Sequence, residues 1–122
     1  MILGTGIDLC AIDRMARAIG RARFLERVYT PAERLRIEAA TEHRRGEIAA
    51  GLFAAKEAVA KALDTGFDDF GPADIEVLPD EKGRPTCTLH NRAAALARGG
   101  RLHISITHES GMAAAVAILE GD

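Results

Sequence analysis

Two carboxylates and a lysine stand in segments that the sequence predicts to be shielded from water. Asp8 lies between Ile7 and Leu9 in an apolar N-terminal segment, and Glu57 and Lys61 lie about one helical turn apart in a long alanine-rich run. A buried carboxylate needs a charged partner. Two carboxylates that meet at one place suit a hard cation such as Mg²⁺, which also accepts phosphate oxygens and water. Asp8 and Glu57 are therefore candidate metal ligands, provided that the fold brings them together.

Glu57 and Lys61 also have a simpler interpretation as a surface ion pair, which on an exposed helix contributes about 0.2–0.5 kcal/mol. The apolar residues around Glu57 and Lys61 favour a ligand site, but they leave the surface ion pair open as an alternative. At about 100° per residue, a helix over residues 48–63 is apolar on almost all sides. One face carries Ile48, Leu52, Ala55, Val59, Ala62 and Leu63, and the two charges are surrounded by Ala50, Phe53, Ala54, Ala58 and Ala60. We expect this helix to be buried by its own fold or by a partner chain.

The elements that must position these residues indicate an α+β domain over residues 1–122, a length typical of one hydrophobic core. A glycine-rich strand over residues 2–10 carries Asp8. Thr30-Pro31-Ala32-Glu33 is a capping box that predicts a helix to about residue 40. Short helices are expected at 13–20, with Asp13 as its cap, and at 24–28 and 91–98. Alternating patterns predict strands at 74–78, 86–89, 102–108 and 113–119, paired as antiparallel sheet.

Composition limits the possible partners and compartments. The 48% hydrophobic and 28% charged residues are ordinary for a globular protein, and the net charge of −2 gives no general attraction to nucleic acid or anionic membranes. Cys10 and Cys87 are isolated thiols, with no zinc-binding spacing. The N-terminus has neither a signal-peptide pattern nor a membrane-spanning run. We therefore expect a cytoplasmic protein that binds neither nucleic acid nor membrane.

Five arginines in the first quarter of the chain form a local exception to this charge balance. They are Arg14, Arg17, Arg21, Arg23 and Arg27, opposed in this region only by Asp8, Asp13 and Glu26. They could simply keep two short amphipathic helices hydrated, which is the commoner role for such charges. Alternatively, they could present a basic face to an acidic partner.

The sequence resembles the holo-acyl-carrier-protein synthase family of 4′-phosphopantetheinyl transferases. Three segments carry the resemblance, in matching order and spacing over essentially the whole chain: Gly6-Ile7-Asp8 with Ile12 and Arg14, Phe53-Ala54-Ala55-Lys56-Glu57-Ala58-Val59-Ala60-Lys61-Ala62, and Ser105-Ile106-Thr107-His108. The resemblance implies a mainly antiparallel sheet packed on a long central helix. It also implies a homotrimer with active sites at subunit boundaries.

The implied reaction transfers 4′-phosphopantetheine from coenzyme A to a serine of apo acyl carrier protein, with Mg²⁺, and releases adenosine 3′,5′-bisphosphate. It would serve fatty acid biosynthesis, with polyketide biosynthesis as an open alternative. Asp8 and Glu57 would bind Mg²⁺, and Lys61 would stabilise or protonate the leaving phosphate. Glu57 is the candidate base for the serine proton, directly or through a water on the metal. The implied coenzyme A contacts are Lys56, Lys61, Gly66, Gly83, Arg84, Pro85, Ser105, Thr107 and His108, and the implied carrier-protein contacts are Arg14, Arg21, Arg23, Phe24 and Arg27.

Two positions depart from the family pattern and keep other functions open. Leu52 stands where an arginine often precedes Phe-Ala-Ala-Lys-Glu, which puts one nucleotide-phosphate contact in doubt. Asp64 stands where a glycine often follows the helix, and it adds negative charge near the expected pyrophosphate. The alternatives are a coenzyme A or carrier-protein binding module without turnover, and a metal-dependent phosphodiesterase.

Overall fold

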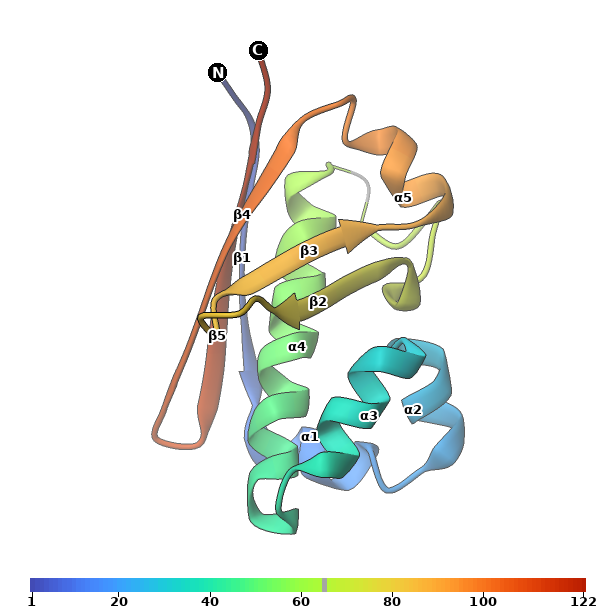
Figure 1. The fold of residues 1–122 in the computed structure, drawn as a ribbon, viewed down its shortest axis with the longest axis vertical. Coiled ribbons are helices and arrows are strands. Elements are labelled where there is room, and N and C mark those ends of the chain that lie inside the picture. The colour runs from blue at the N-terminus through green and yellow to red at the C-terminus, as the bar shows by residue number, and fades with distance from the viewer. Residues whose placement is uncertain (65) are drawn as a thin grey trace.

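One long helix, α4 (Glu42–Ala62), runs through the middle of the molecule and contacts most of the other elements (Figure 1). The computed structural model describes residues 1–64 and 66–122. In chain order the other elements are β1 (Ile2–Ala11), α1 (Ile12–Ala18), α2 (Ala22–Val28), α3 (Pro31–Ala39), the 3₁₀ turn η1 (Pro72–Asp74), β2 (Ile75–Pro79), β3 (Pro85–Leu89), α5 (Asn91–Leu96), β4 (Arg101–Glu109) and β5 (Met112–Glu120).

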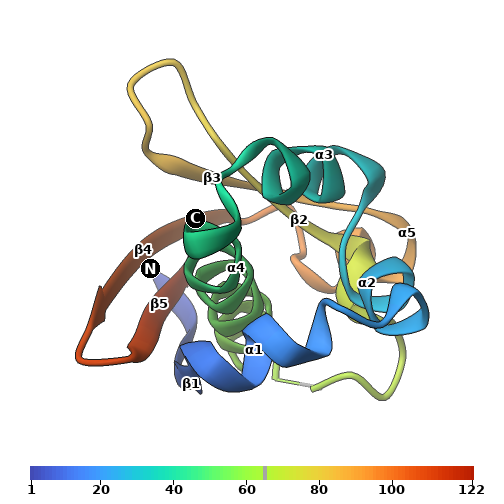
Figure 2. The ribbon, with the colours of Figure 1, turned by 90° about the horizontal axis from the view of Figure 1, so that it is seen from below.

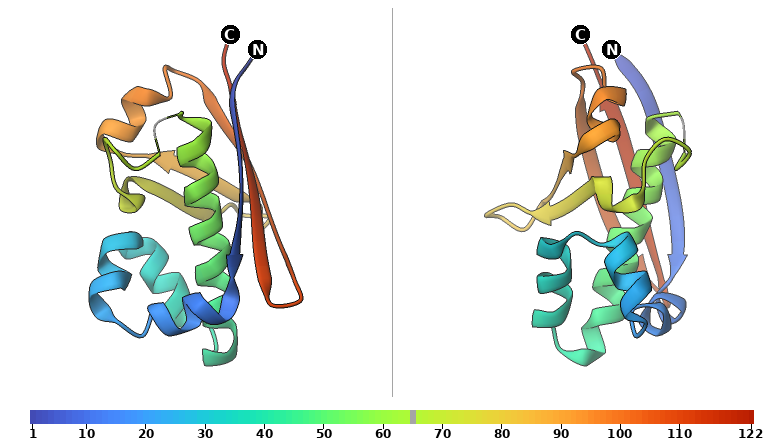
Figure 3. Two further views of the ribbon diagram at one scale, coloured as in Figure 1. Left: turned by 180° about the vertical axis from the view of Figure 1, so that it is seen from behind. Right: turned by 90° about the vertical axis from the view of Figure 1, so that its right-hand side faces the viewer.

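All strand pairs are antiparallel, and the α+β prediction is confirmed. The three longest strands form one sheet in the order β1-β5-β4, and β2 and β3 form a separate hairpin. Figure 3 shows the long strands along one side of α4, with the short helices and the hairpin on the other sides. Figure 2 looks along α4 and shows these elements arranged around it. The helix is therefore enclosed by its own fold over most of its circumference.

The composition of α4 explains how it can be enclosed so tightly. Twelve of its residues are buried, and most of them are Ala or Gly. Small side chains let neighbouring backbones approach closely, which compensates for the scarcity of large aromatic residues in this core. The prediction that this helix is apolar and buried on almost all sides is confirmed.

Two glycines hold β1 directly against α4. A Cβ atom at Gly6 would lie 1.8 Å from the carbonyl oxygen of Ala58, and one at Gly4 would lie 2.0 Å from the carbonyl oxygen of Ala62. Any other residue at these positions would force the strand away from the helix. The close approach also places Asp8, two residues beyond Gly6, beside the last turns of α4.

Several element boundaries differ from the sequence prediction. Helix α4 begins at Glu42, six residues before the predicted start, so the charged segment ahead of the apolar run is helical. Helix α1 begins at Ile12 with Ala11 at the N-cap, so the prediction that Asp13 caps it is wrong. The capping box of α3 is confirmed: the Glu33 amide donates to Thr30 Oγ1 at 3.3 Å, and the Thr30 amide donates to Glu33 Oε1 at 2.8 Å.

The sheet face that points away from α4 carries apolar side chains in solvent. Strand alternation turns Asp8 toward the helix side, whereas Ile7 and Leu9 point outward and are 68% and 62% exposed. None of the helices in the described part of the chain covers this outer face (Figure 3). Those helices also include none with the length and apolar character that a membrane crossing requires.

Candidate functional site

Asp8, Glu57 and Lys61 come together where β1 crosses the last turns of α4. The Lys61 ammonium donates to the carbonyl oxygen of Ile7 at 2.8 Å and lies 3.5 Å from Asp8 Oδ1. The Lys61 side chain is 54% exposed and that of Asp8 is 21% exposed, so the pair opens to solvent. Glu57 is half-buried. The structure thus brings the three residues to one accessible place, which the sequence alone could not establish.

The electrostatics of Glu57 show that the two carboxylates influence each other. Burial raises the pKa of Glu57 above its usual value, and the negative charge of Asp8 raises it further. The positive charges of Lys61 and Arg14 act in the opposite direction. Two carboxylates that repel each other at a solvent-open edge form a suitable donor pair for a divalent cation.

The donor set also indicates which kind of cation fits. In the described ranges 1–64 and 66–122, no three or more His, Cys, Asp or Glu side chains cluster as a metal-binding group. An all-protein cage of the zinc type is therefore not offered here. A pair of carboxylates fits Mg²⁺, which commonly takes one or two of them and fills its other positions with water and substrate phosphates.

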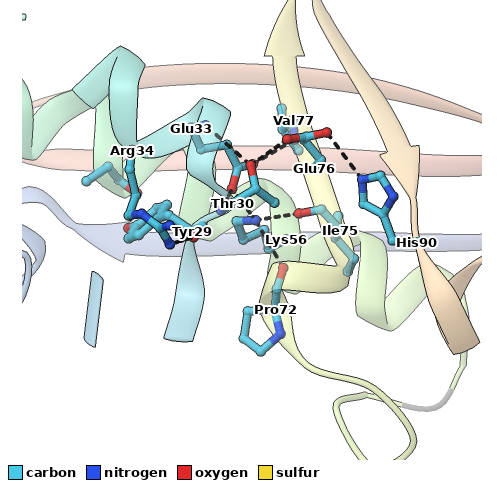
Figure 4. Close-up of polar contacts among 11 residues, drawn as sticks. Tyr29, Thr30, Glu33, Arg34, Lys56, Pro72, Ile75, Glu76, Val77 and His90 are labelled. Atoms are coloured by element: carbon cyan, nitrogen blue, oxygen red, sulfur yellow. Dashed lines mark hydrogen bonds and ion pairs between the residues drawn. The ribbon is translucent and has the colours of Figure 1, made fainter. Parts of the chain in front are cut away.

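Lys56 does not belong to this centre, which corrects the prediction that it contacts a phosphate. Its side chain is fully buried, and its ammonium lies 2.7 Å from Oε1 of Glu33, which is equally buried. The ammonium also donates to the carbonyl oxygens of Pro72, at 3.0 Å, and Ile75 (Figure 4). These partners occupy the three donors of an ammonium group, so none is left for a ligand.

Glu33 makes this buried ion pair the centre of a larger network. Besides Lys56, it accepts from the amides of Thr30 and Val77, the latter at 2.7 Å. The Thr30 hydroxyl in turn donates to Glu76 at 2.5 Å, so α3, α4 and β2 are joined through polar groups (Figure 4). Sequence reasoning assigned Glu33 to the capping box and missed its contact with Lys56. A buried lysine inside an apolar run was the available signal that an acidic partner was needed.

A pocket of about 190 Å³ lies between the N-terminal half of α4, the β2–β3 hairpin and β4. Gly83, Pro85 and His108, three of the predicted nucleotide contacts, line it. His108 Nε2 lies 2.5 Å from Oε1 of Glu47, which also lines the pocket. The structure therefore groups three of the predicted nucleotide contacts around one cavity.

Other predicted nucleotide contacts lie outside this pocket. Strand alternation puts Ser105 and Thr107 on the opposite face of β4 from Ile106 and His108. Arg84 folds over its own turn, with Nε 3.3 Å from Asp80 Oδ2. Gly66 follows α4 at the other end of the helix, with a φ of 59°. These residues do not form one surface with the pocket in a single protomer.

The pocket and the carboxylate centre lie on opposite sides of α4. Ile48 and Leu52 line the pocket, and Glu57 and Lys61 belong to the centre. Ile48 precedes Glu57 by nine positions, and Leu52 precedes Lys61 by nine positions. On an α-helix, nine positions correspond to a rotation of roughly 180° and a rise of about 13 Å. A ligand that touches both regions of one protomer would have to cross the helix.

The predicted carrier-protein contacts form an exposed basic surface beside the carboxylate centre. Arg14, Arg21, Arg23 and Arg27 are all exposed on α1, α2 and the residue before α2. Phe24 is half-buried among them, and the Arg21 guanidinium lies 5.9 Å from its ring centroid. Arg14 Nη2 lies 4.0 Å from Sγ of Cys10, two residues beyond Asp8 on β1, so this surface adjoins the centre.

The two departures from the family pattern have distinct structural settings. Leu52 is buried at the pocket wall, so no positive charge projects from this position. Asp64 is exposed, with a left-handed φ of 67° just beyond the end of α4. A glycine adopts this conformation without strain. The neighbouring Thr65 lies outside the described residues.

Comparisons with known proteins agree with this geometry. The family model of the 4′-phosphopantetheinyl transferase superfamily matches residues 4–117. Holo-[acyl-carrier-protein] synthases of Nitratidesulfovibrio vulgaris (strain DP4) and Moorella thermoacetica are 48% and 46% identical to this chain. Both alignments cover 98% of the chain, and they cover 99% and 94% of the relatives.

Solved structures show the same likeness in three dimensions. The holo-(acyl-carrier-protein) synthase of Bacillus anthracis, in complex with CoA (3′,5′-ADP), has a TM-score of 0.85 at 34% identity, with 100% of this chain and 99% of that chain covered. The Helicobacter pylori synthase, in complex with coenzyme A, has a TM-score of 0.83 at 31% identity, with coverage of 95% and 99%.

This chain belongs to the 4′-phosphopantetheinyl transferase superfamily. Within that superfamily it falls among the holo-[acyl-carrier-protein] synthases, which are transferase enzymes.

Proposed function

We propose that this chain transfers 4′-phosphopantetheine from coenzyme A to a serine of an apo acyl carrier protein, in a Mg²⁺-dependent reaction that serves cytoplasmic fatty acid biosynthesis. The observation that carries the proposal is the meeting of Asp8, Glu57 and Lys61 at one solvent-open edge of β1 and α4. The relatives' names and their coenzyme A complexes support the choice of substrates.

In this proposal, Asp8 and Glu57 would hold Mg²⁺. The ion would supply positive charge to offset the charge developing on the pyrophosphate oxygens of coenzyme A. The carrier serine oxygen forms a bond to the phosphorus that bears pantetheine, and the bond from that phosphorus to the bridging oxygen breaks. The bridging oxygen leaves with adenosine 3′,5′-bisphosphate.

Two side chains would handle the charge and the proton of this step. The exposed ammonium of Lys61, anchored on Ile7 and Asp8, is placed to stabilise or protonate the leaving phosphate. We assign Glu57 to take the serine proton, directly or through a water, because its carboxylate belongs to the same centre as Asp8 and Lys61. The ammonium and the carboxylate thus have complementary roles.

The site would be completed by a second copy of the chain, in a homotrimer. The outward apolar face of β1 in a single protomer, with Ile7 and Leu9 exposed, supports such an assembly. The separation of the pocket from the carboxylate centre by the width of α4 supports it as well. In an assembly, the pocket of one protomer could face the centre of its neighbour. Sedimentation of the purified protein as a monomer at micromolar concentration would contradict this part of the proposal.

The carrier protein would dock on the basic surface formed by Arg14, Arg21, Arg23 and Arg27 around Phe24. Positive charge next to the centre would attract an acidic carrier and orient its serine. The same arrangement explains why an otherwise weakly acidic chain concentrates arginines in two short helices.

The reaction is tested by incubating the protein with coenzyme A, Mg²⁺ and an apo acyl carrier protein, and weighing the carrier by mass spectrometry. We expect a gain of one phosphopantetheine per carrier, prevented by a chelator. Binding of coenzyme A without any gain would instead identify a binding module. Consumption of coenzyme A with an unmodified carrier would identify a phosphodiesterase.

A further inference from the structure

Lys56 directly precedes Glu57 in α4, yet its ammonium is buried and takes no part in the carboxylate centre. It bonds instead to Glu33 of α3, to the carbonyl oxygen of Pro72 in η1 and to that of Ile75 in β2 (Figure 4). One side chain therefore attaches the turn of α4 that carries the proposed metal ligand to three other elements.

Helix α2 rests on two of these elements. It contacts both η1 and α3, and with the residue before it carries three of the four arginines of the basic surface. On the α3 side, Arg34 Nη1 donates to the carbonyl oxygen of Tyr29, the C-cap residue of α2, at 2.7 Å (Figure 4). Arg34 directly follows Glu33 in α3. A movement of α3 or η1 relative to α4 would therefore carry α2 with it.

The direct contacts that α2 and its C-cap residue make with α4 are weaker constraints. The ring centroid of Phe24 lies 6.4 Å from that of Phe53, and the Tyr29 hydroxyl donates to the carbonyl oxygen of Ala49 at 2.8 Å. Aromatic contacts accept a range of offset geometries, whereas the hydrogen bonds of a buried ammonium fix a position. The position of α2 relative to α4 thus depends on the three bonds of Lys56.

The two carboxylates of the centre have a separate support. A Cβ atom at Gly6 would overlap the carbonyl of Ala58, so β1 packs directly on α4 and brings Asp8 to Glu57. This contact does not involve Lys56. Loss of the lysine should therefore act on the basic surface and leave the carboxylates in place relative to each other.

We propose that Lys56 is a positioning residue for the carrier protein. Through Glu33 and η1 it holds α2 at the place from which a docked carrier can present its serine to the carboxylate centre. The inference rests on the proposed function for the carrier and for its docking surface. It gives Lys56 no contact with coenzyme A. Small displacements matter here, because the rate of a transfer reaction depends steeply on the placement of the reacting atoms.

Binding measurements distinguish positioning from a phosphate contact. For Lys56→Met, titration calorimetry should give a dissociation constant for an apo acyl carrier protein that is raised by about tenfold, because part of the charged docking surface is displaced. The dissociation constant for coenzyme A should change by less than about twofold. Weaker binding of coenzyme A with unchanged carrier binding would assign Lys56 to the phosphates and overturn the inference.

Two further variants separate positioning from lost stability. The double variant Glu33→Gln/Lys56→Met removes both charges, so no buried charge is left unpaired. It should fold and keep the defect toward the carrier. Leu119→Ala is the matched control, because Leu119 is fully buried near the C-terminal end of β5, at the opposite end of the molecule from α2 (Figure 1). This control should lose stability and bind the carrier normally. Equal weakening of carrier binding in the control would overturn the inference.

Kinetics separate failure of this inference from failure of the proposed function. In the double variant, the KM for the carrier should rise by about tenfold and the KM for coenzyme A should change by less than about twofold. An unchanged carrier KM would overturn the positioning role of Lys56 and leave the transferase intact. No transfer by the unaltered protein would overturn the proposed function, and the carrier titration would still decide on Lys56. A carrier that does not bind the unaltered protein would overturn both.

Discussion

Lys56 and Lys61 lie five residues apart on the same helix and belong to two different regions of the molecule. Lys56 is fully buried against Glu33 and two carbonyl oxygens, so its charge is satisfied within the protein. Lys61 is 54% exposed and holds Asp8 at 3.5 Å beside a half-buried Glu57. The buried pair can only support the fold, whereas the open centre keeps charge available to a ligand.

The contrast shows that a lysine in a family motif need not touch the substrate. Glu57 directly follows Lys56, and about 100° of helix rotation is enough to move one residue into the interior and the next toward the open edge. What the buried pair contributes is a fixed position of α4 relative to α3 and β2. The open centre depends on that position, because Glu57 and Lys61 project from the same helix.

The largest effect on stability is expected for Lys56→Met. Removing the ammonium leaves Glu33 charged and unpaired in the interior, which typically costs about 3–5 kcal/mol of unfolding free energy. Lys61→Met should change that quantity by less than about 1 kcal/mol, because its ion pair is solvent-exposed. Urea denaturation of both variants measures the difference. Similar losses in both would remove the distinction between the two regions.

Gly6→Ala is expected to have the next largest effect, because it acts on the contact that joins β1 to the open centre. The new methyl group would overlap the carbonyl of Ala58, so β1 must move, at a cost of about 1–3 kcal/mol. Asp8 would move with the strand, and transfer activity should fall as well. Gly71→Ala is the control, since nothing lies within 4 Å of its added methyl group. Thermal unfolding that is identical for the two variants would contradict the close approach.

Asp64→Gly should have a smaller effect on the unfolding free energy than Gly6→Ala, and in the stabilising direction. Asp64 has a left-handed φ of 67°, a conformation that favours glycine, so the change should raise the unfolding free energy by up to about 1 kcal/mol. It should not reduce transfer, because it also removes negative charge near the proposed pyrophosphate site. A loss of stability in chemical denaturation would show that the Asp64 side chain has a favourable role of its own.

Arg14→Glu should leave stability almost unchanged, because the side chain is exposed. We expect a KM for the carrier protein raised by about tenfold and a KM for coenzyme A changed by less than about twofold. Initial rates with each substrate varied in turn provide the measurement. Equal losses toward both substrates would mean that Arg14 acts on the open centre and not on docking.

The sequence predicted the parts of this fold that depend on local patterns. The capping box at Thr30 and Glu33 and the apolar character of residues 48–63 follow from spacing alone, and both are confirmed. The start of α4 was misplaced because the charged residues before Ile48 show no apolar periodicity. Contacts with the fold, and not the pattern itself, extend the helix back to Glu42.

The sequence could not separate the buried pair from the open centre. Lys56 meets Glu33, which is 23 positions away in the sequence, through the packing of α3 on α4. Periodicity predicted burial of charge near Glu57, and the family resemblance supplied Asp8 as its partner. Neither source indicates a long-range contact between two ordinary helix residues. Arg36 of α3 and Arg44 of α4, which both line the pocket, were missed for the same reason, since they come from different helices.

Glu57→Gln should reduce transfer activity without reducing stability at neutral pH. The difference in stability between this variant and the wild type should depend on pH. A raised pKa means that the folded protein binds the Glu57 proton more tightly than the unfolded chain does. Without Mg²⁺, the wild-type protein should therefore lose stability as the pH rises from the usual glutamate pKa through the raised one. The Gln variant lacks this loss, so it should be at least as stable as the wild type at neutral pH. Denaturation at several pH values checks the sign.

The most direct test of the two-region account is the rate of Mg²⁺-dependent phosphopantetheine transfer by Glu57→Gln, measured beside its unfolding free energy. We predict a transfer rate reduced by at least about 100-fold in a protein that folds and assembles like the wild type. A wild-type transfer rate in this variant would contradict the assignment of Asp8, Glu57 and Lys61 as the catalytic centre.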